Sequence, residues 1–185
     1  MRTRTKVWLL VATALVLLGG ILFAGVMTKL DWDFMKLSTV KYETNIYEIS
    51  EAFDGISIST DTADIVFEPS VDGKCTLACY EDENAKHSVA VENNVLVVKI
   101  NNQKTWHDYI GFCFGSEKIT VYLPKAEYAS LLIQNNTGDI EIPNAFTFKD
   151  ADISLSTGDV HFCASASENI KILCSGERRN CLALL

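Results

Sequence analysis

A repeated segment near the C-terminal end constrains the fold of this chain more than any other feature. The segments LIQNNTGDIEI, from Leu132, and DISLSTGDVHF, from Asp152, align on their glycines, and IKILCSGERRN, from Ile170, aligns with them at a third glycine. The spacings between these glycines are 20 and 18 residues. An earlier segment, ISISTDTADIVF from Ile56, has the same apolar alternation with Ala-Asp in place of Gly-Asp. Recurrence of one strand-turn-strand unit predicts an all-β fold, namely a β-solenoid or a repetitive stack of strands.

The Thr-Gly-Asp triplets of the repeats are predicted to be structural turns. They comprise Thr137, Gly138, Asp139, Thr157, Gly158 and Asp159. Glycine supplies the positive φ of a sharp corner, and threonine and aspartate side chains can hydrogen-bond the amides of the turn. The alternative is that Asp139 and Asp159 stack about 4.8 Å apart and bind calcium. Because calcium prefers roughly six to eight oxygen ligands, and the third copy offers only Glu177, we predict scaffolding turns and no metal site.

Short alternating runs also fill the segment before the repeats. They are rich in Val, Ile, Thr and aromatic residues and are bounded by Asp, Asn, Gly or Pro, which is typical of strands and turns. The pair Asn93-Asn94 separates two such runs and predicts a tight hairpin, because asparagine tolerates positive φ. We therefore expect an extracytoplasmic β-repeat domain over residues 42–177, after a juxtamembrane connector at 28–41 and before a degenerate tail at 178–185.

The stretch from Val7 to Met27 predicts a single transmembrane helix. It holds 21 residues without a charge, enough to span about 31 Å of hydrocarbon as a helix. Arg2, Arg4 and Lys6 lie in a short cytoplasmic tail at 1–6 by the positive-inside rule, which places everything after the helix outside the cell membrane. A cleaved signal peptide is the alternative, but its apolar region is usually only about 7 to 15 residues long. We expect an uncleaved anchor, with the lipid bilayer as partner of residues 7–27.

The charge distribution excludes polyanionic partners. The chain has 16 basic and 24 acidic residues, and the first 29 residues contain four of the basic ones and none of the acidic ones. The remainder therefore carries 12 basic against 24 acidic groups, a formal charge of −12. Since affinity for phosphate backbones depends on clusters of Lys and Arg, nucleic acid is not expected to bind.

Titratable and sulfur-containing residues show no catalytic or metal-binding pattern. The six cysteines contain no C-x-x-C pair, and buried free thiols are predicted for Cys75, Cys79, Cys113, Cys163, Cys174 and Cys181. The three histidines share no motif with a nucleophile, so surface or turn positions are predicted for His87, His107 and His161. The acidic run at 81–84 is predicted to be a solvated turn. No enzyme and no cofactor are expected.

One aromatic segment, TWHDYIGFCFGS at 105–116, interrupts the series of strands. Its aromatic side chains are Trp106, Tyr109, Phe112 and Phe114. Such a cluster either caps the open end of the β stack or forms a contact surface for a partner. We favour the cap, because a stack of strands requires one.

The order of these pieces resembles the bacterial putative-adhesin family, a group of exported β-strand-repeat domains of unknown function. The resemblance runs over roughly residues 41–172, through YETNIYEIS, ISISTDTADIVFEPS, KITVYLP and the two Thr-Gly-Asp strands. It implies a right-handed, solenoid-like β domain displayed at a bacterial surface, and it brings no catalytic residues. Members similar to this chain continue through more repeats, whereas CSGERRNCLALL loses the alternation, so we expect a truncated or frameshifted C-terminus.

We therefore expect a non-enzymatic, membrane-anchored domain that binds or senses an unidentified ligand of the cell envelope. A carbohydrate-active β-helix enzyme, such as a polysaccharide lyase, is the first alternative. The second is an accessory subunit of a membrane stress-sensing system, recruited through the helix.

Overall fold

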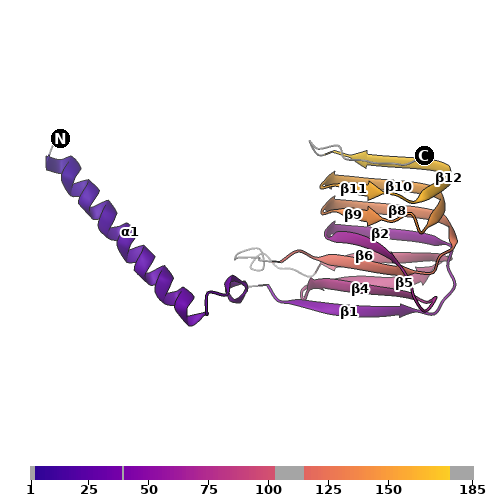
Figure 1. Ribbon diagram of the computed structural model, residues 1–185, viewed down its shortest axis with the longest axis horizontal. Coiled ribbons are helices and arrows are strands. Elements are labelled where there is room, and N and C mark those ends of the chain that lie inside the picture. Colours follow the sequence, from indigo (N-terminus) through magenta and orange to yellow (C-terminus); the bar gives the residue numbers. More distant parts are fainter. Residues whose placement is uncertain (1–2, 39, 103–114, 176–185) are drawn as a thin grey trace. The chain divides into compact units, whose positions relative to one another are not determined.

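The structure is a computed structural model that describes residues 3–38, 40–102 and 115–175. Within these residues it has one long helix and a separate β domain, and each is described here by itself. Figure 1 shows both, with the chain coloured from N- to C-terminus.

Helix α1 spans Thr3–Lys29 and is apolar along almost its whole length. The part from Thr5 to Lys29 is long and apolar enough to cross a membrane, and none of its most apolar stretch is buried against other parts of the protein. The helix ends where Asp31 and Trp32 adopt positive φ, and the Trp32 amide donates to the Met27 carbonyl at 2.9 Å. A short 3₁₀ helix, η1 (Phe34–Leu37), follows.

The β domain contains twelve strands in two six-stranded sheets among the described residues. Their bounds are β1 (Tyr42–Ile49), β2 (Gly55–Thr62), β3 (Asp64–Pro69), β4 (Cys75–Asp82), β5 (Ala85–Glu92), β6 (Val95–Asn102), β7 (Lys118–Leu123), β8 (Glu127–Thr137), β9 (Ile140–Ile142), β10 (Thr147–Thr157), β11 (Val160–Phe162) and β12 (Ser165–Cys174). One sheet has the order β1-β4-β7-β3-β9-β11 and the other the order β12-β10-β8-β2-β6-β5. The protein is thus mostly β, with an N-terminal helix.

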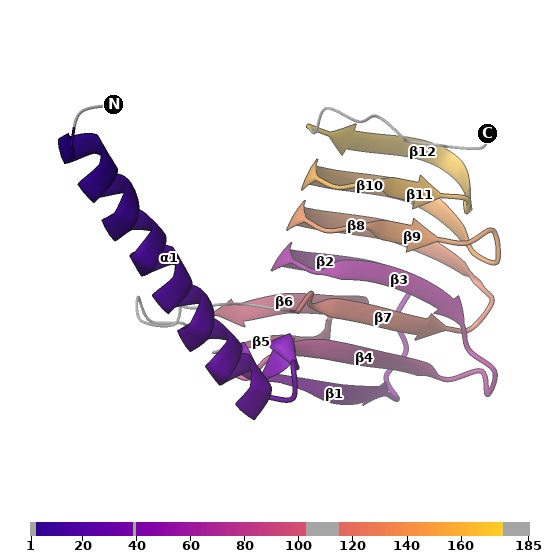
Figure 2. The same ribbon diagram turned by 60° about the vertical axis from the view of Figure 1, so that its left-hand side comes forward.

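Parallel pairing dominates the part of the domain that contains the repeats. The pairs β2–β3, β8–β9 and β10–β11 each turn a corner from one sheet to the other, and we call each pair a repeat unit. Successive units lie in parallel register, so that Figure 2 shows them as stacked layers. Strands β6 and β7 continue the parallel pairing on the other side of β2 and β3.

Columns of aliphatic side chains form the core between the two sheets. In the second sheet Ile58 pairs with Ile133, which pairs with Ile153, and all three are fully buried. In the first sheet Ile65 pairs with Ile140 and Ile140 with Val160 in the same way. Because residues two apart point to the same face of a strand, the alternation in the sequence places one such residue from every layer inside.

Antiparallel pairing closes the other end of the stack. Strand β1 pairs with β4, β4 with β7, and β5 with β6. The β5–β6 connection is a hairpin whose turn residues, Asn93 and Asn94, have φ values of 50° and 67°. The hairpin predicted from this asparagine pair is therefore confirmed.

Candidate functional site

The two Thr-Gly-Asp turns lie at the corners of successive repeat units. Gly138 and Gly158 have φ values of 131° and 129°, a region that side-chain-bearing residues rarely adopt. A Cβ atom at Gly138 would collide with the backbone carbonyl of Ala63, and one at Gly158 with that of Gly138. Glycine is thus required both by the corner conformation and by the close approach of adjacent units.

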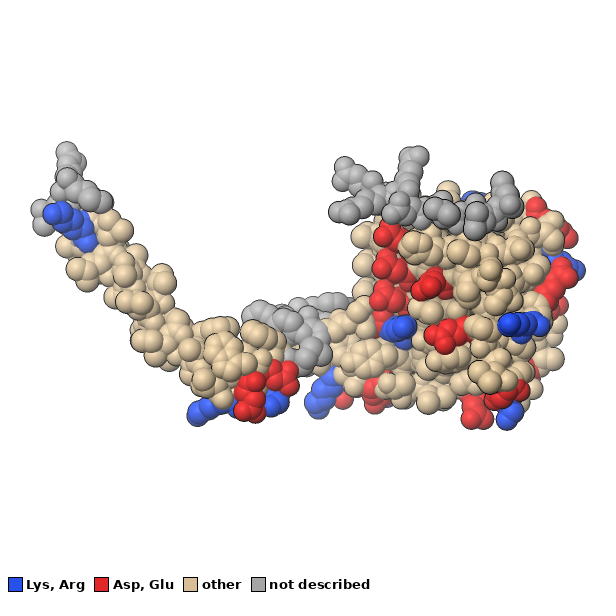
Figure 3. Space-filling view, in the orientation of Figure 1, with Lys and Arg blue, Asp and Glu red and all other residues tan. Residues whose placement is uncertain are grey.

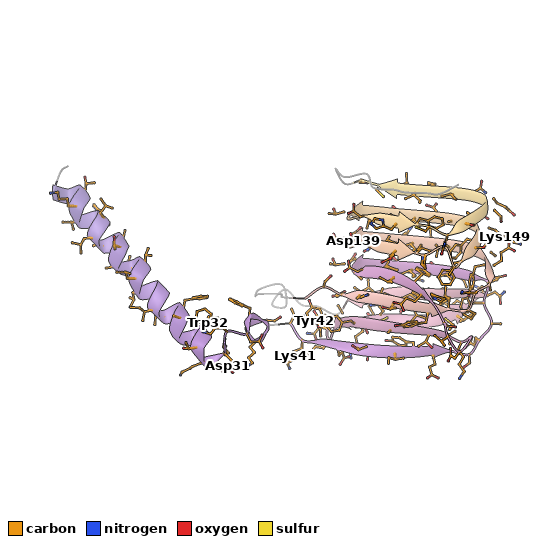
Figure 4. All side chains as sticks on the ribbon, in the orientation of Figure 1. Asp31, Trp32, Lys41, Tyr42, Asp139 and Lys149 are labelled. Atoms are coloured by element: carbon orange, nitrogen blue, oxygen red, sulfur yellow. The ribbon has the colours of Figure 1, made fainter. Side chains whose placement is uncertain are left out.

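The aspartates of these corners connect neighbouring units. The Asp139 amide donates to Oδ1 of Asp64 at 2.9 Å, and the Asp159 amide donates to Oδ1 of Asp139 at the same distance. Each acceptor carboxylate therefore bonds the next unit, rather than an amide of its own turn. Acidic side chains form a column along this edge of the domain (Figure 3), where Asp139 is labelled in Figure 4. Thr137 and Thr157 pair in register beside them and are exposed.

Trp106, Tyr109, Phe112 and Phe114 lie outside the described residues, as do His107, Cys113 and Cys181. Whether the cluster caps the stack or forms a contact surface stays a prediction.

A polar cluster that the sequence did not predict lies inside the antiparallel end of the domain. Glu81 and His87 are 0% and 3% exposed, so the predicted surface position of His87 is wrong. The predicted solvated turn at 81–84 is also wrong in its first half, since Asp82 is buried together with Glu81, while Glu83 and Asn84 are exposed. His161, by contrast, is exposed as expected.

Hydrogen bonds hold the Glu81 carboxylate from three directions. Its Oε2 accepts the His87 amide at 2.7 Å and lies 2.6 Å from His87 Nδ1. Its Oε1 accepts Nδ2 of Asn45 at 2.8 Å. The other ring nitrogen of His87, Nε2, lies 2.9 Å from the hydroxyl of Thr60. Every polar atom of the buried pair thus has a partner, as burial of charged groups demands.

The sulfur of Cys79 belongs to the same cluster. One ligand atom from each of Cys79, Glu81 and His87 lies within 4.8 Å of the others, and all three residues are buried. Burial, and then the Glu81 carboxylate, raises the pKa of the Cys79 thiol to about 12. Burial raises the pKa of the Cys75 thiol to about 12 as well. The prediction of buried free thiols is confirmed for Cys75 and Cys79, but Cys163 is exposed and Cys174 half-buried.

An alternation pattern could have revealed this cluster. Cys75, Leu77, Cys79 and Glu81 are spaced by two and all point inward from β4, and Ala85 and His87 do the same from β5. The charge of Glu81 and His87 favours an exposed position, whereas their place in the alternation puts them inside. The supporting contacts of Asn45 and Thr60 come from distant strands and leave no signal in the sequence.

An open pocket of about 530 Å³ lies elsewhere on the β domain. It is formed by the β1–β2 connection, the start of β4 and the β7–β8 connection. Phe53 and Tyr128 stack at 6.1 Å in its wall, and the Tyr128 hydroxyl donates to the Pro124 carbonyl at 2.9 Å. Burial, with a smaller effect of Cys75, raises the pKa of Tyr128 to about 12. Four charged side chains also line the pocket, namely Glu48, Glu51, Lys74 and Glu127.

The sequence matches the model of a family described as Toastrack DUF4097 over residues 53–174. None of the curated proteins matches the chain. Among solved structures, a putative cell adhesion protein from Clostridium sporogenes has a TM-score of 0.50 at 12% identity, with 74% of this chain and 68% of that chain covered. A putative adhesin from Parabacteroides distasonis has a TM-score of 0.42 at 12% identity, over 65% of this chain and 56% of that chain. A putative adhesin from Bacteroides fragilis has a TM-score of 0.37 at 18% identity, over 75% of this chain and 94% of that chain.

Proposed function

Because the chain belongs to the Toastrack DUF4097 family, a relationship that confirms the resemblance to adhesin-like domains of unknown function, we propose that it is a non-enzymatic, membrane-anchored domain of the cell envelope. Its β domain binds or senses a ligand outside the membrane. The parallel stacking of the repeat units supports the description of this domain as a β-solenoid.

Helix α1 supports the anchoring part of the proposal. Its uncharged stretch is long enough to span the hydrocarbon layer, and most of the side chains along it are exposed. Basic residues precede the stretch, and Asp31 and Asp33 follow its end, so the positive-inside rule directs the β domain outward.

Fractionation of cells that express the full chain tests the anchor. The chain should stay in the membrane after alkaline carbonate extraction, and external protease should degrade the β domain in intact cells. Replacement of Arg2, Arg4 and Lys6 by glutamate should reduce this protease accessibility, whereas replacement of three exposed lysines of the β domain should not. A soluble product that lacks the first two dozen or so residues by mass spectrometry would refute the anchor.

The pocket that contains Phe53 and Tyr128 carries the binding part of the proposal. Ligand sites are typically concave, with an apolar wall and a few polar groups that orient the ligand. Here the wall is aromatic, and the lining has three carboxylates but only one ammonium group, which favours a cationic ligand such as a basic peptide. The −12 formal charge outside the helix favours the same class of ligand.

Binding of a lysine-rich peptide to the full chain in detergent tests the pocket. The double variant Glu51→Gln/Glu127→Gln should weaken binding by at least about tenfold. The matched variant Glu92→Gln/Glu141→Gln removes the same charge from exposed positions outside the pocket and should have a much smaller effect. Equal losses in the two variants would show nonspecific attraction by net charge, and would contradict a pocket site.

A further inference from the structure

Three donor atoms of the kinds that bind zinc meet in the interior of the β domain. Cys79 and Glu81 point inward from β4, and His87 points inward from β5, just beyond the turn at 83–84. Their ligand atoms lie within 4.8 Å of one another. Thiolate, imidazole and carboxylate are the ligands that Zn²⁺ takes in proteins.

Hydrogen bonds from neighbouring strands orient the Glu81 carboxylate and the His87 ring toward each other. Asn45 holds Oε1 of Glu81, and Thr60 holds Nε2 of His87, so Oε2 and Nδ1 are the atoms that approach to 2.6 Å. Metal-bound histidines ordinarily have their second ring nitrogen hydrogen-bonded in this way, which sets the ring orientation and the tautomer. Among the described residues, no hydrogen bond holds the Cys79 sulfur, which lies beside these two atoms.

The charges of the group also match a divalent cation. A thiolate from Cys79, the carboxylate of Glu81 and a neutral His87 carry two negative charges, which one Zn²⁺ ion neutralises. An uncompensated charge at a fully buried site is costly, so neutrality is a requirement here.

We propose that Cys79, Glu81 and His87 form a buried site for a divalent ion of the zinc type. The ion takes the place of the proton between Nδ1 and Oε2, and that proton and the proton of the Cys79 thiol both leave to solvent. Three protein ligands leave a fourth position for water. Because the three side chains are buried, the ion enters during folding or through local opening of the turn at 83–84.

The full chain, unfolded in denaturant and refolded in detergent with Co²⁺, tests this site. The expected result is one cobalt ion per chain, with the near-ultraviolet thiolate-to-cobalt absorption that oxygen and nitrogen ligands do not produce. Cys79→Ser should abolish this absorption. Cys75→Ser is the matched control, because Cys75 is also buried on the same strand but lies outside the cluster, and it should keep the absorption.

The wild-type chain decides the question even where a variant fails to fold. Zn²⁺ should raise its thermal unfolding midpoint above that measured with a chelator, because the ion binds only the folded state. Absence of the thiolate absorption in the wild type would overturn the proposal, as would its persistence in Cys79→Ser. Neither result depends on the membrane anchor or on the peptide pocket.

Discussion

The repeat units and the antiparallel end of the β domain are built in opposite ways. In the repeat units, each layer contributes the same apolar positions and the same corner, so that Ile133 and Gly138 have counterparts in Ile153 and Gly158. In the antiparallel end, the Glu81–His87 pair has no counterpart among the residues that the structure describes, and its partners come from strands far away in the sequence.

This difference predicts which single substitutions lower the free energy of unfolding most. A repeated interaction is supported by its copies in neighbouring layers. A buried polar pair has no copy, and removal of one member leaves the other desolvated without a partner. Thr60 connects the two parts, because it lies on strand β2 of the first repeat unit and its side chain contacts His87.

Loss of the Glu81 carboxylate should have the largest effect on stability. Glu81→Ala leaves the His87 amide, His87 Nδ1 and one Asn45 donor without their acceptor in the interior. We expect a loss of about 3 to 5 kcal/mol in the free energy of unfolding, measured by urea denaturation. Glu92→Ala, at an exposed position on the adjoining strand, should change it by less than about 0.5 kcal/mol. A small effect of Glu81→Ala would contradict this comparison, because the antiparallel end would then tolerate the loss of one interaction as well as the repeat units do.

A side chain at a corner of the repeat units should have the next largest effect. Gly138→Ala forces alanine into positive φ and against the Ala63 carbonyl, at a cost of about 2 to 4 kcal/mol in unfolding free energy. Gly73→Ala is the control, because Gly73 also has positive φ but no atom lies within 4 Å of an added Cβ. It should cost about 1 kcal/mol. Similar costs for both would show that packing between layers contributes nothing at the corner.

Removal of one carboxylate from the acidic column should have a modest effect. Asp139→Ala leaves the Asp159 amide without its acceptor, but water can replace it because Asp139 is exposed. We expect a loss of about 1 kcal/mol or less in unfolding free energy, and faster hydrogen exchange at the Asp159 amide. Glu141→Ala, at an exposed position on β9, should leave that exchange unchanged. A loss as large as that for Glu81→Ala would contradict the contrast between the two parts.

The exposed pair of Glu43 and Lys86 should have the smallest effect. Lys86 Nζ lies 2.6 Å from the Glu43 carboxylate and, with the Asn45 amide, lowers its pKa. The pair therefore stabilises the fold above the pKa that Glu43 has in the unfolded chain, and this contribution is lost as the pH falls through the lower folded-state value.

Lys86→Gln should raise the pKa of Glu43 toward its ordinary value, as measured by NMR titration of the carboxyl carbon, with little change in stability near neutral pH. Lys171→Gln, which removes the partner of Asp152, is the control and should leave the Glu43 titration unchanged. An unchanged pKa of Glu43 in Lys86→Gln would mean that the ion pair does not persist in solution.

Much of the fold was predictable because its signals are local. Alternation identified the strands, the spacing of Gly138 and Gly158 identified the repeat, and Asn93-Asn94 identified a hairpin, since each depends on the conformation of a few adjacent residues. The antiparallel pairing of β1 and β4 was not predictable, because two strands separated by 25 residues meet there without a repeat to align them.

The candidate sites were predictable only in part, for the same reason. The alternation of buried and exposed positions along β4 and β5 would have indicated that Glu81 and His87 are buried. Their contacts with Asn45 and Thr60 were not predictable, because they join residues 36 and 27 positions apart. The lining of the pocket likewise comes from two chain connections and the start of a strand. None of these segments supplies enough of the lining residues to indicate a cavity by itself.

The sequence by itself determined the apolar helix, the β class of the domain and the glycine corners, because length, alternation and backbone freedom act on neighbouring residues. Only the tertiary structure decided that the corner aspartates bond the next unit and that a thiol, a carboxylate and an imidazole meet in the core. The physical reason is that burial and through-space contact depend on which strands pair, and strand pairing brings together residues that the chain keeps apart.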